Sequence, residues 1–83
     1  GYTVWRNNAG MGRHNIRLSP KGTPDIIGYT PSGRFLGIEV KDAKGKLTAI
    51  QEAWLEKATV AGCLSFVARS VEDVEKVIKE FEV

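Results

Sequence analysis

The sequence has very few of the residues that cross-link small proteins or build their metal sites. It contains one cysteine, Cys63, and one histidine, His14. A single cysteine excludes an internal disulfide and any zinc site built from cysteine pairs, and it fits a reducing compartment. We expect Cys63 to be buried filler rather than a nucleophile, because it lies in an apolar run far from His14 in sequence. As a metal ligand, His14 lacks partners.

Long apolar segments, repeats and low-complexity tracts are also absent. No apolar stretch approaches the roughly 18–20 residues that span a bilayer, and no signal peptide opens the chain. The 83 residues suffice for a single domain, residues 1–83, and for no second core. A chain this short buries only a modest share of its surface. We therefore expect the folded chain to have low stability, which oligomerisation would increase. These features predict a cytoplasmic protein.

The charge is unevenly distributed, although the net charge is only +2. Up to Lys46 there are eight Lys and Arg residues against three acidic ones, a local charge of +5. From Leu47 onward there are four against seven, a local charge of −3. The basic half suits a polyanionic partner, whereas the acidic half is what two solvated helix faces would give.

The chain is organised around a predicted hairpin. The segment Thr30–Gly33 has proline at its second position and glycine at its last, which is typical of a type I turn that closes a three-residue loop, with Gly33 left-handed. If Thr30 pairs with Arg34, Asp25 lies directly opposite Glu39. Because side chains alternate along a strand, Lys41 shares a face with both carboxylates.

Two carboxylates opposite each other across a ladder repel, which destabilises the sheet. A divalent cation between Asp25 and Glu39 would reverse this effect, because hard cations such as Mg²⁺ bind one or two carboxylates together with phosphate and water oxygens. Lys41 would then hold or deprotonate a water, or stabilise charge on a phosphate. The alternative is an ordinary exposed strand face with a Glu39–Lys41 salt bridge. The preceding Pro24-Asp25 pair, at cross-strand spacing, favours the cation site.

Pro24-Asp25 followed by Glu39-Val40-Lys41 resembles the PD-(D/E)XK nuclease signature. Together with Gly22–Gly28, Gly37–Lys41 and Gln51, it resembles the VRR-NUC domain, which is found alone in phages and bacteria and fused in eukaryotic repair nucleases. The resemblance covers nearly the whole chain, from Val4 to the last helix. It implies an α/β fold with a restriction-endonuclease-like core, a central mixed β-sheet of about four strands flanked by helices.

The resemblance also implies a function: a metal-dependent, structure-specific DNA endonuclease, and hence a phosphodiester hydrolase. Stand-alone domains of this kind act as homodimers on branched DNA such as four-way (Holliday) junctions, and the short chain favours that form. We therefore expect DNA as the partner and the cytoplasm of a bacterial cell or phage-infected host as the location. The alternatives are a non-catalytic nucleic-acid-binding module and a structural dimerisation domain. The binding module is disfavoured by the presence of Asp25, Glu39 and Lys41, because acidic side chains that face phosphates weaken DNA binding unless a metal ion lies between them.

By the same resemblance, Asp25, Glu39 and the backbone carbonyl of Val40 would hold Mg²⁺ or Mn²⁺, and Lys41 would position or activate the water. Gln51 has two interpretations. With Thr48 it forms a capping-box pattern, in which its side chain bonds back to the backbone. In the resembling families the equivalent glutamine projects toward the site. We expect one role to exclude the other, and we favour the site.

The sequence departs from the family pattern in one respect. Family members usually carry an acidic residue on a helix before the first strand, whereas this sequence has no such helix and no acidic residue before Asp25. Either an upstream segment is missing from the sequence, which begins at Gly1 without a methionine, or the site is reduced.

Residue patterns predict strands near 2–6, 24–30, 34–41 and 64–68 and helices near 48–61 and 71–81. The order strand, helix, strand predicts a crossover that places the last strand parallel to a hairpin strand. Apolar residues recur at helical spacing in both helices and predict their buried stripes. These are Ile50, Trp54, Ala58 and Ala61 in the first, and Val71, Val74, Val77, Ile78 and Phe81 in the second.

Residues 7–22 form a long polar segment rich in basic residues, which we interpret as a flexible arm on DNA phosphates. The plain alternative is a solvated loop. With the basic residues near the hairpin, the predicted DNA-binding set is Arg6, Asn7, Arg13, His14, Arg17, Lys21, Lys44 and Lys46.

Overall fold

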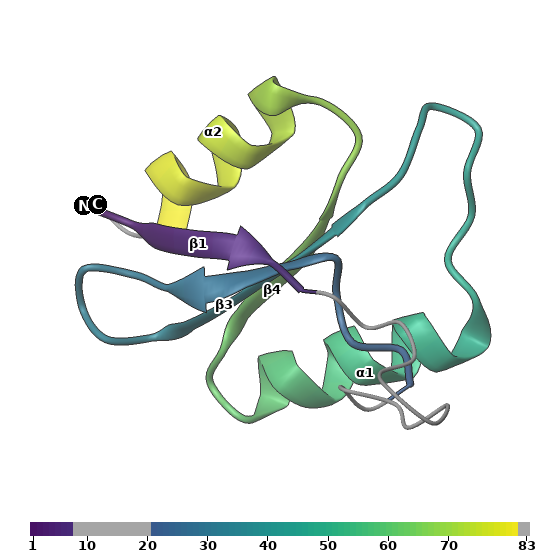
Figure 1. Cartoon of the computed structure of the whole chain (residues 1–83), viewed down its shortest axis with the longest axis horizontal. Coiled ribbons are helices and arrows are strands. Elements are labelled where there is room, and N and C mark those ends of the chain that lie inside the picture. Colours follow the sequence, from purple (N-terminus) through teal and green to yellow (C-terminus); the bar gives the residue numbers. More distant parts are fainter. Residues whose placement is uncertain (8–20, 82–83) are drawn as a thin grey trace.

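A four-stranded mixed β-sheet forms the centre of the molecule, and one helix packs against each of its faces (Figure 1). This computed structural model describes residues 1–7 and 21–81. The strand order is β1-β2-β3-β4; β1, β2 and β3 are antiparallel, and β3 and β4 are parallel. The predicted α/β fold is thereby confirmed. The elements in chain order are β1 (Thr3–Arg6), β2 (Ile26–Tyr29), β3 (Phe35–Val40), α1 (Ala49–Val60), β4 (Leu64–Ala68) and α2 (Val71–Phe81).

The hairpin between β2 and β3 has the predicted turn and register. The Thr30 N–H donates to the Arg34 carbonyl over 2.9 Å, and the Gly33 N–H donates to the Thr30 carbonyl over 2.9 Å. Gly33 has a φ of +84°, the left-handed conformation that only glycine adopts at little cost. Ile26 pairs with Ile38 in the ladder. One further step along the same register sets residue 25 opposite residue 39.

The helix α1 carries the chain across the sheet from β3 to the parallel strand β4, as the strand-helix-strand order predicted. The Thr48 hydroxyl accepts a hydrogen bond from the Gln51 N–H at 3.1 Å, which caps the first turn. The predicted stripe is partly wrong. Leu55 and Ala58 are buried, whereas Ile50 is 44% exposed, because it lies against Gly22 rather than on the sheet.

The apolar core lies on the α2 side of the sheet. Val74 and Val77 of α2 pack there, against a buried cluster formed by Leu36, Ile38, Leu64 and Ala68. Val71, which was predicted to join the buried stripe of α2, is 69% exposed. Cys63 is a free thiol that is half-buried rather than fully buried.

The opposite face of the sheet carries the predicted site residue Glu39. Because side chains alternate, Leu36 and Ile38 point to the α2 side, and Gly37 and Glu39 point to the α1 side. A Cβ on Gly37 would lie 3.4 Å from the ring of Trp54, which confirms that α1 covers this face. Among residues 1–7 and 21–81, no helix has both the length and the apolar character needed to cross a membrane.

Candidate active site

Asp25 is held at the end of the sheet by two buried or half-buried neighbours. Pro24 is fully buried, and it packs closely on β3 at Gly37, where a Cβ would lie only 3.1 Å from the Pro24 ring. Asn7 follows β1 and donates twice to this segment, from its backbone to the Asp25 carbonyl at 2.7 Å and from its side chain to the Pro24 carbonyl at 3.0 Å. The backbone that carries Asp25 is therefore fixed from both sides.

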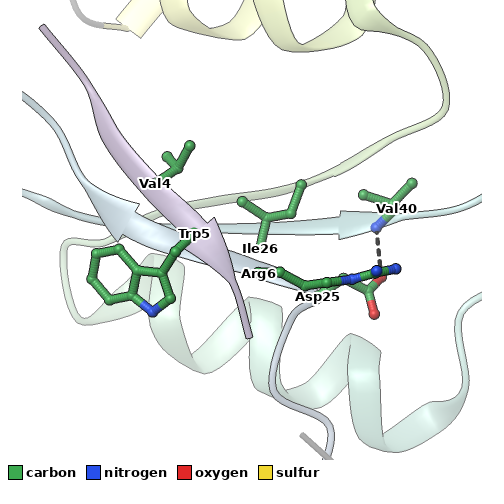
Figure 2. A pocket seen from close by; sticks show the side chains of 6 residues that line it. All are labelled: Val4, Trp5, Arg6, Asp25, Ile26 and Val40. Atoms are coloured by element: carbon green, nitrogen blue, oxygen red, sulfur yellow. Dashed lines mark hydrogen bonds between the residues drawn. The ribbon is translucent and has the colours of Figure 1, made fainter. Parts of the chain in front are cut away.

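The Asp25 carboxylate is exposed and points along the end of β3. Its Oδ2 accepts a hydrogen bond from the Val40 N–H at 3.0 Å, and Figure 2 shows this bond beside the end of β1. Because Val40 follows Glu39 in the chain, the bond brings the two carboxylates together. The predicted cross-strand arrangement of Asp25 and Glu39 thus has its geometric basis in the hairpin register and in this one hydrogen bond.

Glu39 is a buried carboxylate with an incomplete set of partners. Its residue is 2% exposed, and its Oε1 accepts from Gln51 Nε2 at 2.9 Å. Its Oε2 is buried without a hydrogen-bond partner. Burial raises the pKa of Glu39 to about 7, and the neighbouring charge of Asp25 adds to the rise, while Lys41 opposes it. A buried polar atom without a partner is costly, so this oxygen is suited to a positively charged ligand.

Gln51 performs both of the roles that we expected to exclude each other. Its Oε1 accepts from the Thr48 N–H at 3.0 Å, and its Nε2 donates to Glu39 Oε1 at 2.9 Å. The expectation was wrong because a primary amide has an acceptor at one end and a donor at the other. The Thr48 N–H can only donate, so it fixes which end of the amide faces Glu39. The helix cap and the site are one hydrogen-bonded unit.

Lys41 follows β3 and lies on the same side as Glu39. Its Nζ is 3.8 Å from Glu39 Oε1, and its side chain is 21% exposed. At this distance the ammonium group interacts with the carboxylate and still reaches solvent. The salt bridge of the plainer interpretation is therefore present, and it is compatible with a role for Lys41 on a substrate phosphate.

Asp25, Glu39 and Gln51 line a hollow of about 430 Å³ between the start of α1 and the end of the hairpin. Gly22 lets the chain come close to the helix here: its φ is +88°, and a Cβ on it would lie 2.6 Å from the Ile50 side chain. Lys21, which precedes Gly22, is exposed at the edge of the hollow. A second hollow, of about 560 Å³, shares Asp25 and is lined by Arg6 and Val40 (Figure 2).

The predicted basic contacts separate into three groups. Arg6 and Lys21 lie near Asp25, as described above. Lys44 and Lys46 are exposed on the loop between β3 and α1. Arg69, which sequence reasoning missed, fixes this loop by donating from Nη1 to two of its backbone carbonyls, each at 2.6 Å; these belong to Asp42 and Gly45. Arg13, His14 and Arg17 lie outside the described residues.

The donor set of the site fits a magnesium-like cation. Within residues 1–7 and 21–81, His, Cys, Asp and Glu residues form no cluster of three or more that could hold a metal, so the protein carboxylates at this site are Asp25 and Glu39. Mg²⁺ is usually held by one or two carboxylates, with waters and substrate phosphates completing its coordination. The unpartnered Glu39 Oε2 is available for such an ion. A contribution from the Val40 carbonyl stays a prediction.

Two positioning contacts were not recognised from the sequence. Pro24 packs on Gly37, and Arg69 donates to the loop between β3 and α1, because the fold brings distant segments together. The capping-box pattern did predict the local pairing of Thr48 with Gln51, but it did not indicate the link from Gln51 to Glu39.

Comparison with known proteins supports the resemblance. The model of one protein family, described as the VRR-NUC domain, matches residues 4–72. Comparisons with curated proteins and with solved structures return no match.

The raised pKa of Glu39 predicts a specific dependence of stability on pH. A carboxyl whose pKa is about 7 when folded and 4.5 when unfolded stabilises the fold at low pH, and this contribution is lost as the pH rises through about 7. Without divalent ions, we expect the free energy of unfolding to fall by on the order of 3 kcal/mol between about pH 4.5 and about pH 8 through this group alone. Denaturant titrations at several pH values measure it.

The Glu39→Gln variant, which cannot ionise, should lack this fall. Glu52→Gln, which alters an exposed carboxylate next to Gln51, should keep it. Curves of the same shape for wild type and Glu39→Gln would contradict the raised pKa.

Proposed function

We propose that this chain, which belongs to the VRR-NUC domain family of nucleases, is an endonuclease that hydrolyses phosphodiester bonds in DNA with the help of Mg²⁺ or Mn²⁺. One observation carries the proposal: a buried Glu39 leaves one oxygen without a partner beside the exposed carboxylate of Asp25. This arrangement is unfavourable in the absence of a cation and becomes favourable when one is bound.

Asp25 and Glu39 would hold the ion, which when bound lowers the pKa of a water and polarises a phosphoryl oxygen. The side chains around the ion would have two further roles. Gln51 donates to Oε1 and so orients the Glu39 carboxylate, while Oε2 keeps its capacity to accept a ligand. Lys41 has its ammonium group 3.8 Å from the same carboxylate, from where it can position a water or stabilise charge that develops on the phosphate.

A binding module without chemistry is the weaker candidate. Two adjacent carboxylates repel a phosphate backbone, so they would reduce affinity in a protein that only binds DNA. Their presence beside Lys41, Lys21 and Arg6 fits hydrolysis better than binding alone.

The proposed substrate is branched DNA, and the proposed active form is a homodimer. A compact domain with one metal site cuts one strand, so symmetric cuts in two strands require two sites related by a twofold axis. The small core on the α2 side supports this proposal, because pairing would bury apolar area that a short chain leaves exposed.

The metal site predicts that Asp25 and Glu39 contribute to the same binding event. In calorimetric titrations with Mn²⁺, Asp25→Asn and Glu39→Gln should each abolish or greatly weaken binding, because each removes one anionic ligand without removing the side chain. The control is again Glu52→Gln, which should bind Mn²⁺ as wild type does. Undiminished binding in both site variants would rule out the site.

Lys41 is predicted to act on the chemical step. Lys41→Ala should leave Mn²⁺ and DNA affinity roughly unchanged and should reduce the cleavage rate by about two orders of magnitude or more, the scale of losing one acid–base or electrostatic group. Single-turnover cleavage of a labelled junction measures it. Lys76→Ala, on the exposed side of α2, serves as the control. A cleavage rate within a few-fold of wild type would show that Lys41 is an ordinary surface lysine.

The dimer and its substrate preference are tested together. Light scattering at micromolar concentration should give twice the mass of one chain, and a four-way junction should be cut in preference to linear duplex of the same sequence. A monomer that cuts both equally would remove the junction proposal and leave the nuclease proposal standing.

A further inference from the structure

The α1 side of the sheet presents three partly exposed aromatic side chains. Trp5 is 51% exposed, Tyr29 49% and Phe35 40%, and we refer to these residues as the aromatic row. Tyr29 pairs with Phe35, and Trp5 pairs with Ile27, two residues from Tyr29 on β2. Alternation along the strands therefore puts the row on one face of the sheet.

The aromatic row lies on the same face as the candidate active site. The ladder between β1 and β2 continues to Asp25, because the Asn7 N–H donates to its carbonyl. Trp5 is then a diagonal neighbour of Asp25, at a spacing of about 7–8 Å. Figure 2 shows the Trp5 ring on the opposite side of β1 from Val4.

The ring of Phe35 lies 6.2 Å from that of Trp54, so the far end of the row is supported by α1. The row therefore starts beside the site, at Trp5 on the edge strand β1, and runs across β2 to the Phe35 end of β3, where α1 packs.

Three features favour nucleobases as the occupant of this surface. Exposed aromatic rings on a sheet stack on bases of any sequence, because every base has a π-face. The part of the chain up to Lys46, which contains the whole row, carries a net charge of +5 that complements a polyanion. A second copy of the chain on this face would also cover the exposed Asp25.

We propose that the aromatic row stacks on unpaired bases of a DNA strand whose phosphate lies at Asp25 and Glu39. This inference rests on the nuclease function proposed above and makes its substrate more specific. In a continuous duplex both faces of each base are covered by its neighbours, so a flat protein surface finds free base faces only at branches, forks and single-stranded ends. Stacking at the row would then select DNA with unpaired bases next to the cut.

The test measures binding without cleavage. The Asp25→Asn variant, without divalent ions, is titrated with a forked DNA whose unpaired arm carries either normal bases or abasic sites. Adding Trp5→Ala should weaken binding to the normal arm by about 5- to 150-fold, the effect expected for one stacked base. Trp5→Phe should retain most of the affinity. Val4→Ala, an exposed neighbour on the other face of β1, is the control and should change nothing.

The abasic arm makes the test specific for stacking. The parent variant, which keeps Trp5, should bind the abasic arm more weakly than the normal arm by a similar factor. Adding Trp5→Ala should weaken binding to the abasic arm little further, because the two changes remove the same contact. An equal effect of Trp5→Ala on both arms, or no effect, would overturn the proposal. So would a shift from dimer to monomer in Trp5→Ala without any dependence on the bases, which would identify the row as a contact between two copies.

Failure of the nuclease proposal would be distinguishable from failure of this one. If the wild-type chain does not cut the fork with Mn²⁺ while base-dependent binding through Trp5 persists, hydrolysis is refuted and stacking stands. If it cuts and Trp5→Ala binds both arms as the parent does, stacking is refuted and hydrolysis stands.

Discussion

The hydrogen bond from Gln51 to the buried carboxylate of Glu39 is the interaction on which the rest of the site depends. Burying a carboxylate is costly, and here the cost is only partly offset, since one oxygen has a donor and the other has none. The amide of Gln51 is oriented by the Thr48 N–H at the start of α1. A local feature of the chain, the helix cap, therefore determines the direction of a side chain on β3. The site depends on the position of α1, and α1 is placed by its packing on β3 and β4.

The two faces of the sheet differ in the residues they carry. The α2 side contains the apolar cluster around Leu36 and Ile38, and the α1 side contains Glu39, with Asp25 at the end of the hairpin. A one-residue shift in the hairpin register would move Glu39 to the α2 side and place a charge in the apolar cluster. The turn at Gly33 excludes that shift, so the residues that form the turn also keep the two carboxylates together.

Local patterns predicted the features that follow from short-range geometry. The register of the hairpin follows from the turn residues, and the ends of α1 follow from Thr48 and the glycine after its last turn. Contacts between segments distant in sequence were not predictable in this way. Arg69 reaches the loop that carries Lys44 and Lys46, and Pro24 packs over Gly37, because the fold brings them together. Ile50 fits the spacing of a buried stripe, but the first turn of α1 lies against the loop at Gly22 rather than on the sheet. The link from Gln51 to Glu39 was partly predictable. The capping pattern predicted the contact made by one end of the Gln51 amide, and the family resemblance predicted that of the other end.

We propose that the unpartnered oxygen of Glu39 and the carboxylate of Asp25 bind one divalent cation. A crystal soaked in Mn²⁺ and measured at the manganese absorption edge tests this most directly, because the anomalous signal locates the ion independently of any activity. We expect a single strong peak between the two carboxylates, in contact with Glu39 Oε2, while Gln51 continues to donate to Oε1. A fully soaked crystal with no peak there, or with manganese only at other carboxylates, would contradict it.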